Sequence, residues 1–270
     1  MFNHAAIHDE IETILCKLDA EQFPEACACL RSALDGEESP FLIASHLMEA
    51  DKPGPFPPFL LDFIAELYHT EIAMGNSHAM NNLGAHYYSG GRGFAQSFEK
   101  AVDLYRRAAD LGNRQAQENL GYCHYYGRNM PVDYEKAFHY FALGAFDGWP
   151  ISLYKIGDMY LNGYYVKKDE REAWRLYNRC LQLADEEESR VVSGPVHLRL
   201  GRMCLEGIGT DPDPGQALLH FNLAEIMLYQ MVRDGDYMYN NSLRAAIEGQ
   251  KQAREKLLGS LPDREWTFDD

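Results

Sequence analysis

Hydrophobic residues in the middle of the chain recur at steps of three and four, the spacing of one face of an α-helix. Leu83 and Tyr87 show this spacing in one segment, and Ala101, Leu104 and Ala108 show it in the next. A glycine-rich break separates the two segments. The pattern therefore predicts two helices joined by a turn.

This helix–turn–helix pattern occurs four times. Near-identical stretches, NNLGAHYYSGG at 81–91 and ENLGYCHYYGR at 118–128, mark the first two copies. One glycine of the pattern recurs at positions 84, 121, 157 and 201, in steps of 37, 36 and 44 residues. A period in the thirties is typical of a solenoid, because one hairpin cannot bury both of its apolar faces. The last step is longer by eight residues (44 against 36), and we place the addition in 184–194.

Each copy has small residues at two fixed positions and an aromatic residue at a third. We expect the small residues where the two helices of a hairpin cross, since a glycine inside a helix otherwise costs about 1 kcal/mol relative to alanine. We expect aromatic rings to fill the space between successive hairpins. The small residues are Gly84, Ala101, Gly121, Ala137, Gly157, Ala173, Gly201 and Ala217, and the rings are Tyr105, Phe141, Tyr177 and Phe221. Asp133 and Asp169 directly precede second helices and can cap them.

The segments on either side of the copies are also predicted to be helical. Three short helices are expected at about 7–18, 23–34 and 39–50, with Ser39 as the cap of the third. Residues 57–79 end like the first copy and look like the second helix of a degenerate, capping repeat. A long helix is expected at about 238–258, where it would seal the end of the stack, and the tail after it is expected to be loose.

The charge of the chain narrows the choice of partners. The sequence has 25 basic and 41 acidic residues, which gives a net charge of −16. This excess of negative charge disfavours nucleic acid and an anionic membrane surface, and it is compatible with a basic partner. No signal-peptide pattern and no apolar run of membrane-spanning length is evident. Six scattered cysteines indicate reduced, mostly buried thiols, so we expect a cytoplasmic location.

The copies resemble the Sel-one-like repeat, a relative of the tetratricopeptide repeat. The matching pattern is A-x-x-x-L-G-x-x-Y-x-x-G, a short loop, and K-A-x-x-W/Y-Y/F-x-x-A-A-x-x-G, over about 79–225; the fourth copy has Cys204 in place of the tyrosine. The resemblance implies an all-α, right-handed α/α solenoid of helix-turn-helix repeats. We accordingly divide the chain into an N-terminal helical cap (1–56), a solenoid (57–234, with repeats at about 79–113, 116–148, 150–183 and 195–225) and a C-terminal capping helix with its tail (235–270).

The family resemblance implies a scaffold or adaptor that binds a protein or peptide in a groove lined by the first helix of each repeat. By analogy with the tetratricopeptide repeat, the predicted groove residues are Asn81, Ala85, Tyr88, Ser89, Glu118, Tyr122, Tyr125, Tyr126, Tyr154, Asp158, Leu161, Asn162, Leu198, Arg202, Leu205 and Glu206. Tyrosine is common in binding sites because it offers a large contact area with few rotatable bonds. The alternative is that these rings pack against the adjacent first helices.

Candidate chemistry in the sequence is sparse. The glycine-rich stretch SGGRGFAQS at 89–97 lacks the lysine of a phosphate-binding loop and fits an enlarged repeat turn. His4 and His8 share a helical spacing but have no evident third ligand, so no metal is expected. Cys123 and His124 are adjacent in sequence, which does not suit a nucleophile and its base. The cysteines also do not show the paired spacing of a secreted, penicillin-binding branch of the family.

The sequence therefore predicts a binding protein without catalytic residues, cofactor or metal. One alternative is an enzyme or small-ligand-binding protein whose site lies in the non-repeat N-terminal or C-terminal helices. A second is self-assembly, because an exposed apolar end of the stack would allow a homodimer.

Overall fold

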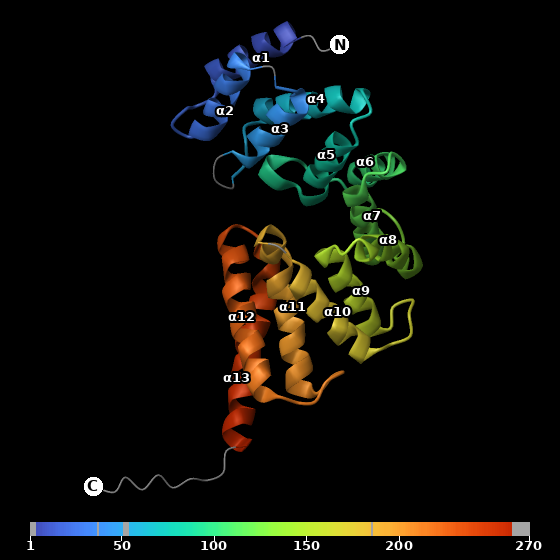
Figure 1. The fold of residues 1–270 in the computed structure, drawn as a ribbon. Helices are drawn as coiled ribbons and strands as arrows, with labels where there is room; N and C mark the ends of the chain where they lie inside the picture. Colours follow the sequence, from blue (N-terminus) through green and yellow to red (C-terminus); the bar gives the residue numbers. More distant parts are fainter. Residues whose placement is uncertain (1–3, 37, 51–53, 185, 261–270) are drawn as a thin grey trace, which may run out of the picture. The chain divides into compact units, whose positions relative to one another are not determined.

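The computed structural model describes residues 4–36, 38–50, 54–184 and 186–260. These residues form α-helices joined by turns and two short 3-10 helices, with no strand anywhere in these ranges. The all-α class predicted from the sequence is confirmed. The chain divides into two compact units, one up to Asp133 and the other from Tyr134 onward (Figure 1). The three-part division expected from the sequence stays a prediction.

The first unit is a succession of helices in which each packs mainly against the next. The three short helices are confirmed, and so is a helix within 57–79, which covers Pro58–Ala73. The helices are α1 (His4–Lys17), α2 (Pro24–Asp35), α3 (Pro40–Glu49), α4 (Pro58–Ala73), α5 (Ser77–Ser89), α6 (Phe98–Asp110) and α7 (Arg114–Tyr126), with the 3-10 helix η1 (Gly91–Gly93) between α5 and α6. The α5–α6 pair is the first complete repeat hairpin.

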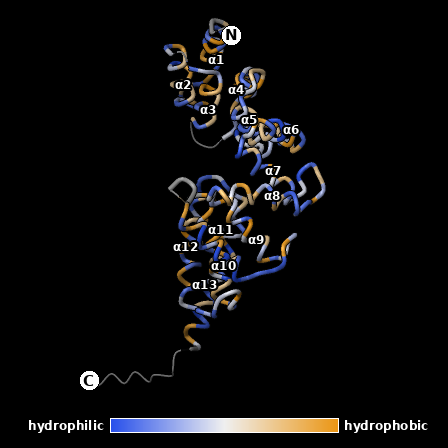
Figure 2. The backbone as a smooth tube through the Cα atoms, turned by 45° about the vertical axis from the view of Figure 1, so that its right-hand side comes forward, coloured by the Kyte–Doolittle hydropathy of each residue, from blue (hydrophilic) through white to orange (hydrophobic). Residues whose placement is uncertain are grey.

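The second unit contains two complete hairpins and the C-terminal helix. Helix α9 pairs with α10 and α11 pairs with α12, while α13 packs along α12. The helices are α8 (Tyr134–Phe146), α9 (Pro150–Asn162), α10 (Glu170–Leu183), α11 (Glu186–Glu206), α12 (Pro214–Arg233) and α13 (Asn240–Ser260), with the 3-10 helix η2 (Tyr237–Tyr239) before α13. Hydrophobic and hydrophilic positions alternate along the helices of both units (Figure 2).

Side-chain caps start several helices, including those at the predicted caps Asp169 and Ser39. The Asp169 carboxylate accepts a hydrogen bond from the Glu172 amide at 3.0 Å, which confirms Asp169 as the cap of α10. The Ser39 hydroxyl accepts from the Leu42 amide at the start of α3. Asn113 and Asp213 do the same for α7 and α12. Each such bond satisfies an amide that has no partner inside its helix.

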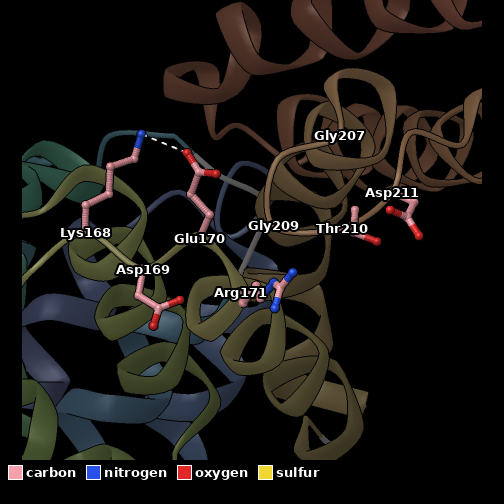
Figure 3. A pocket seen from close by; sticks show the side chains of 8 residues that line it. All are labelled: Lys168, Asp169, Glu170, Arg171, Gly207, Gly209, Thr210 and Asp211. Atoms are coloured by element: carbon pink, nitrogen blue, oxygen red, sulfur yellow. Dashed lines mark ion pairs between the residues drawn. The ribbon is translucent and has the colours of Figure 1, made fainter.

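The turn of each repeat hairpin has left-handed backbone at two positions. Glycine occupies the first position in all four repeats, at 90, 127, 163 and 207. Two residues later the φ angle is again positive, at Arg92, Asn129, Tyr165 and Gly209. Gly209 lies directly against the backbone of Glu170 at the start of α10 (Figure 3), where a Cβ atom would be 2.3 Å from the Glu170 carbonyl oxygen. This close approach requires glycine in the fourth repeat.

The glycine near the middle of α5, α9 and α11 makes room for a ring of the second helix. A Cβ atom on Gly84 would lie 2.8 Å from the Tyr105 ring, and one on Gly201 would lie 2.8 Å from the Phe221 ring. Each ring packs against the glycine of its own hairpin, and the Phe221 ring also lies against Gly249 of the following helix α13. The expectation that such rings fill the space between hairpins is confirmed for Tyr177, which shares a core cluster with Val196 and Leu200 of the next hairpin. The glycines therefore accommodate rings, and at Gly84 the backbone carbonyl oxygen of Ala101 would also lie 3.4 Å from an added Cβ, as expected where the two helices of a hairpin approach each other.

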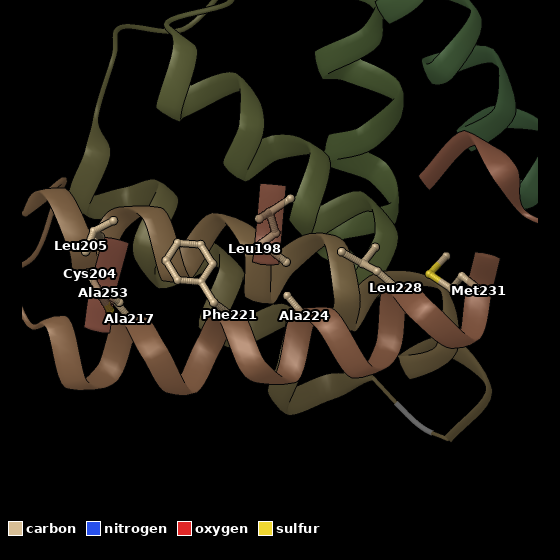
Figure 4. Packing of buried hydrophobic residues seen from close by; sticks show 10 residues of the cluster. Leu198, Cys204, Leu205, Ala217, Phe221, Ala224, Leu228, Met231 and Ala253 are labelled. Atoms are coloured by element: carbon tan, nitrogen blue, oxygen red, sulfur yellow. The ribbon is translucent and has the colours of Figure 1, made fainter. Parts of the chain in front are cut away.

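The eight added residues lengthen α11. This helix has 21 residues, whereas α5, α7 and α9 have 13 each, and the difference equals the extra step in the repeat period. Helices α12 and α13 are similarly long, with 20 and 21 residues. Buried α12 residues lie in a row along the shared core of the three helices (Figure 4): Ala217, Phe221, Ala224, Leu228 and Met231.

Candidate functional site

The predicted partner-binding residues lie on the first helices of the repeats, and several of them join neighbouring helices. Asn81 on α5 is only 2% exposed. Its side-chain amide donates to Gln115 of α7 at 3.1 Å, and its oxygen accepts from Asn119 of α7 at 2.9 Å. Asn81 therefore holds α5 and α7 together. Asn119, which the groove prediction omitted, shares this role.

Tyr88 belongs to an aromatic cluster at the turn end of the first hairpin. Its ring contacts Phe98 with centroids 5.2 Å apart and Tyr105 with centroids 6.5 Å apart. The guanidinium of Arg128 lies 4.8 Å from the centre of the Phe98 ring, a cation–π distance. Burial raises the pKa of Tyr88, while a hydrogen bond from Arg128 acts in the opposite direction. Arg128 was missed from the sequence because it lies in a turn.

Three of the predicted tyrosines form a group at the end of α7. The Tyr122 and Tyr126 rings are nearly parallel with centroids 6.2 Å apart, and the Tyr125 ring meets Tyr126 edge-on at 4.8 Å. The side chain of Tyr126 is 46% exposed, and the Arg128 guanidinium is 5.8 Å from its ring centre. Glu118, one turn earlier on α7, is buried. The group thus presents ring surface to solvent beside a positive charge.

Asp158 in the second unit is buried in an ion pair instead of being open to a partner. Arg199 of α11 contacts both of its carboxylate oxygens, with Nη2 at 3.0 Å from Oδ2. The Tyr177 hydroxyl donates to Asp158 at 2.8 Å, and Arg199 also donates to the Tyr154 hydroxyl at 3.3 Å. Burial alone lowers the pKa of Arg199, but the Asp158 carboxylate reverses this and the pKa is raised. The network joins α9, α10 and α11.

The residue two places before the repeat glycine supplies cross-helix contacts through Asn119 and Arg199. It is polar in every repeat, which is a sequence signal that the groove prediction did not use. Buried Lys155 donates to the Tyr154 hydroxyl at 3.1 Å and has its ammonium nitrogen 3.8 Å from Asp158. The four residues at this place are Asn82, Asn119, Lys155 and Arg199.

The remaining predicted residues differ in exposure. Leu198 and Leu205 are each 4% exposed within the core formed by α11, α12 and α13, so the prediction that they face a partner is wrong. They are covered because α13 packs on the last hairpin. Arg202 and Asn162 are exposed, and the Asn162 side chain donates to the Asp158 carbonyl at 2.7 Å.

The described residues contain no group of three or more His, Cys, Asp or Glu side chains that could hold a metal ion. The side chain of His4, considered with His8 from the sequence, lies outside the described side chains. All six cysteines lie in described segments and none is in a disulfide. Burial raises the pKa of Cys123 to about 12 and that of Cys204 to about 11, so these thiols are poor nucleophiles at neutral pH. Helices in the described ranges are too short or too polar to cross a membrane.

Comparison with known proteins identifies the repeats. The model of the Sel1 repeat matches residues 77–113, 114–145, 150–179 and 196–225. This chain is a Sel1 repeat protein. Sel1 repeat proteins generally serve as protein–protein interaction scaffolds and are typically non-enzymatic. The family resemblance predicted from the repeated motif is confirmed.

Solved structures of other Sel1 repeat proteins share the fold. A Sel1 repeat protein from Oxalobacter formigenes is 18% identical, with a TM-score of 0.54 over 82% of this chain and 84% of that one. A protective antigen of uropathogenic Escherichia coli with an SLR fold is 22% identical, with a TM-score of 0.50 over 72% of this chain and 41% of that one. The predicted α/α solenoid is therefore confirmed.

A curated relative is much longer than this Sel1 repeat protein. The chain is 36% identical over 111 residues to the ERAD-associated E3 ubiquitin-protein ligase component HRD3B of Arabidopsis thaliana. The match spans 40% of this chain and 17% of the plant protein.

Proposed function

We propose that this Sel1 repeat protein is a scaffold that binds a protein or peptide partner on the first helices of its repeats. The observation that carries the proposal is the group of Tyr122, Tyr125 and Tyr126 at the end of α7. Its rings are already packed on one another, so little side-chain entropy is lost when a partner covers them. The half-exposed Tyr126 and the neighbouring Arg128 offer an apolar surface with a charged edge.

The other residues predicted to contact a partner fall into a buried group and a group that is half-buried or exposed. Asn81 and Asp158 are buried and contact neighbouring helices, so we assign them to holding helices together, and Glu118 is also buried. Tyr88 is half-buried against Phe98, and Arg128 lies near both the Phe98 and the Tyr126 rings. In the second unit, exposed Asn162 and Arg202 remain proposed contacts, with half-buried Tyr154 as a supporting residue. The cytoplasmic location stays a prediction.

The experiment has two steps. First, the wild-type protein captures partners from native lysate, and the enriched partner is identified and purified. Its affinity is then measured for the wild type and for Tyr126→Ala and Tyr122→Ala. A central aromatic contact contributes 2 kcal/mol or more, so we expect affinity to fall about 30-fold in the tyrosine variants.

The matched control is Tyr229→Ala, because Tyr229 on α12 is an exposed tyrosine (58%) of the second unit. We expect it to bind like the wild type. Circular dichroism melting curves of all variants establish that they are folded. Unchanged affinity in both α7 variants would show that the partner binds elsewhere.

A further inference from the structure

A pocket of about 590 Å³ lies in the second unit between the second helices of the last two repeats. Its walls come from α10, from the turn before α12 and from the first half of α12. Trp174 and Asn178 are one turn apart on α10, and Gln216 and His220 are one turn apart on α12. Residues 210–214 form its rim, and Cys204 of α11 also lines it.

The polar groups of this pocket are mainly hydrogen-bond acceptors. Asp211 is exposed at the rim, and its carboxylate has no hydrogen bond or ion pair with another residue in the described part of the chain. Asp213 uses Oδ1 to accept from the Gly215 and Gln216 amides, which leaves Oδ2 available. The Asn178 side chain donates to the Trp174 carbonyl at 2.8 Å, so its own oxygen is also available. None of the lining residues is a lysine or arginine.

Two aromatic side chains complete the pocket. The Trp174 and His220 rings are nearly perpendicular, with centroids 6.5 Å apart. Indole is the aromatic group that attracts cations most strongly, so Trp174 favours a positively charged ligand. Burial lowers the pKa of His220, which keeps the imidazole neutral at pH 7 and removes a competing positive charge.

His220 can act as a further acceptor because of its partner. Its Nδ1 lies 3.0 Å from Nδ1 of His197 on α11. Only one of these two nitrogens can carry the hydrogen that they share. When His220 Nδ1 donates to His197, His220 Nε2 is left as an acceptor. A ligand that only donates hydrogen bonds selects this tautomer.

We propose that this pocket binds the guanidinium group of an arginine side chain in a basic partner peptide. Arginine is a flat cation with five N–H donors and no acceptor, and it stacks on aromatic rings. It therefore matches a pocket with a tryptophan wall and several separate acceptors better than a lysine ammonium does. The net charge of −16 also favours approach of a basic peptide.

The basic side chains near the pocket do not take the place of the proposed arginine ligand. Lys168 and Arg171 line a neighbouring cavity that shares Thr210 and Asp211 with the pocket (Figure 3). Lys168 is paired with Glu170 at 2.8 Å. Among the ion pairs of the described residues, Arg171 has none with Asp211. Asp211 therefore remains available to a ligand.

This inference is independent of the tyrosine surface, because Tyr122, Tyr125 and Tyr126 belong to the first unit. The test uses the peptide acetyl-Gly-Arg-Gly-amide and its citrulline counterpart, which has nearly the same shape without the charge. Nuclear magnetic resonance follows the indole N–H of Trp174, assigned by its loss in Trp174→Phe. We expect a saturable shift with the arginine peptide and none with the citrulline peptide. No saturable shift, or equal shifts with both peptides, would overturn the proposal.

A variant that removes one negative charge tests whether the carboxylate of Asp211 at the pocket rim contributes to binding. Asp211→Asn should weaken arginine binding roughly threefold to fivefold, the upper part of the range for an exposed ion pair. Asp110→Asn removes the same charge from an exposed site in the first unit and should leave the affinity unchanged. Equal weakening by both variants would mean that the peptide responds only to net charge, and this result would also overturn the proposal.

Discussion

The ring of Tyr177 occupies the space that a side chain on Gly157 would need. A Cβ atom on Gly157 would lie 2.7 Å from Cε1 of Tyr177, closer than any normal contact. The same ring donates its hydroxyl hydrogen to Asp158, the residue after the glycine. The glycine thus lets α10 bring a tyrosine close enough to complete the Asp158–Arg199 network.

Gly157→Ala is expected to destabilise the protein by about 1–3 kcal/mol, because the added methyl group overpacks the site and displaces the Tyr177 ring. Urea unfolding measures the change. Gly259→Ala is the control with the opposite sign, since Gly259 lies in α13 with nothing within 4 Å of an added Cβ. Alanine there should stabilise the helix by a few tenths up to about 1 kcal/mol. A neutral Gly157→Ala would contradict the packing argument.

Asp158→Asn is expected to destabilise the protein by about 3 kcal/mol, because it leaves the Arg199 charge without its carboxylate partner. The value is at the low end for buried pairs since the Arg199 side chain keeps 26% exposure, against 6% for Asp158. Asp103→Asn breaks an exposed pair with Arg107 and should change stability by less than about 0.5 kcal/mol. Similar effects of the two variants in chemical denaturation would rule out a special role for the Asp158 network.

Stability is expected to fall as the pH is lowered from about 6.5 to about 4. Burial and the neighbouring His220 lower the pKa of His197 to about 4, so the folded protein disfavours the proton that the unfolded chain accepts near pH 6.5. The stabilising contribution is therefore complete above pH 6.5 and is lost progressively toward pH 4. Burial lowers the pKa of His86 to about 4 as well, and it contributes in the same direction.

The contribution of His197 is isolated by His197→Gln. Its free energy of unfolding should depend less on pH between 7.5 and 5 than that of the wild type. His78→Gln changes an exposed histidine of the first unit and should keep the wild-type dependence. An unchanged dependence in His197→Gln would show that protonation of the His197–His220 pair does not oppose folding.

Gly209→Ala is expected to be more destabilising than Gly75→Ala. Both glycines have a positive φ angle, +67° and +84°, so alanine is strained by about 1 kcal/mol at either place. Only at position 209 does the new Cβ also meet backbone, 2.3 Å from the Glu170 carbonyl oxygen. The difference between the two variants in thermal or urea unfolding measures this clash. Equal losses would mean that the turn simply moves away from α10.

The sequence by itself determined the helices, their pairing into hairpins and the repeat family. These features follow from apolar spacing, caps such as Asp169 and the recurring glycines, all of which act within one hairpin. The longer last step of the repeat period in the sequence also predicted the extra length of α11.

Only the tertiary structure decided which first-helix residues face a neighbour and which face solvent. The repeat pattern placed three residues in the predicted groove that the structure shows to be buried. Contacts with α7 bury Asn81, contacts with α11 bury Asp158, and contacts with α13 bury Leu198. The His197–His220 pair and the pocket beside Trp174 likewise need residues from α10, α11 and α12 together. The repeat period and the polarity of a residue indicate which face of its own helix the residue occupies. These contacts depend instead on how different helices pack across the core.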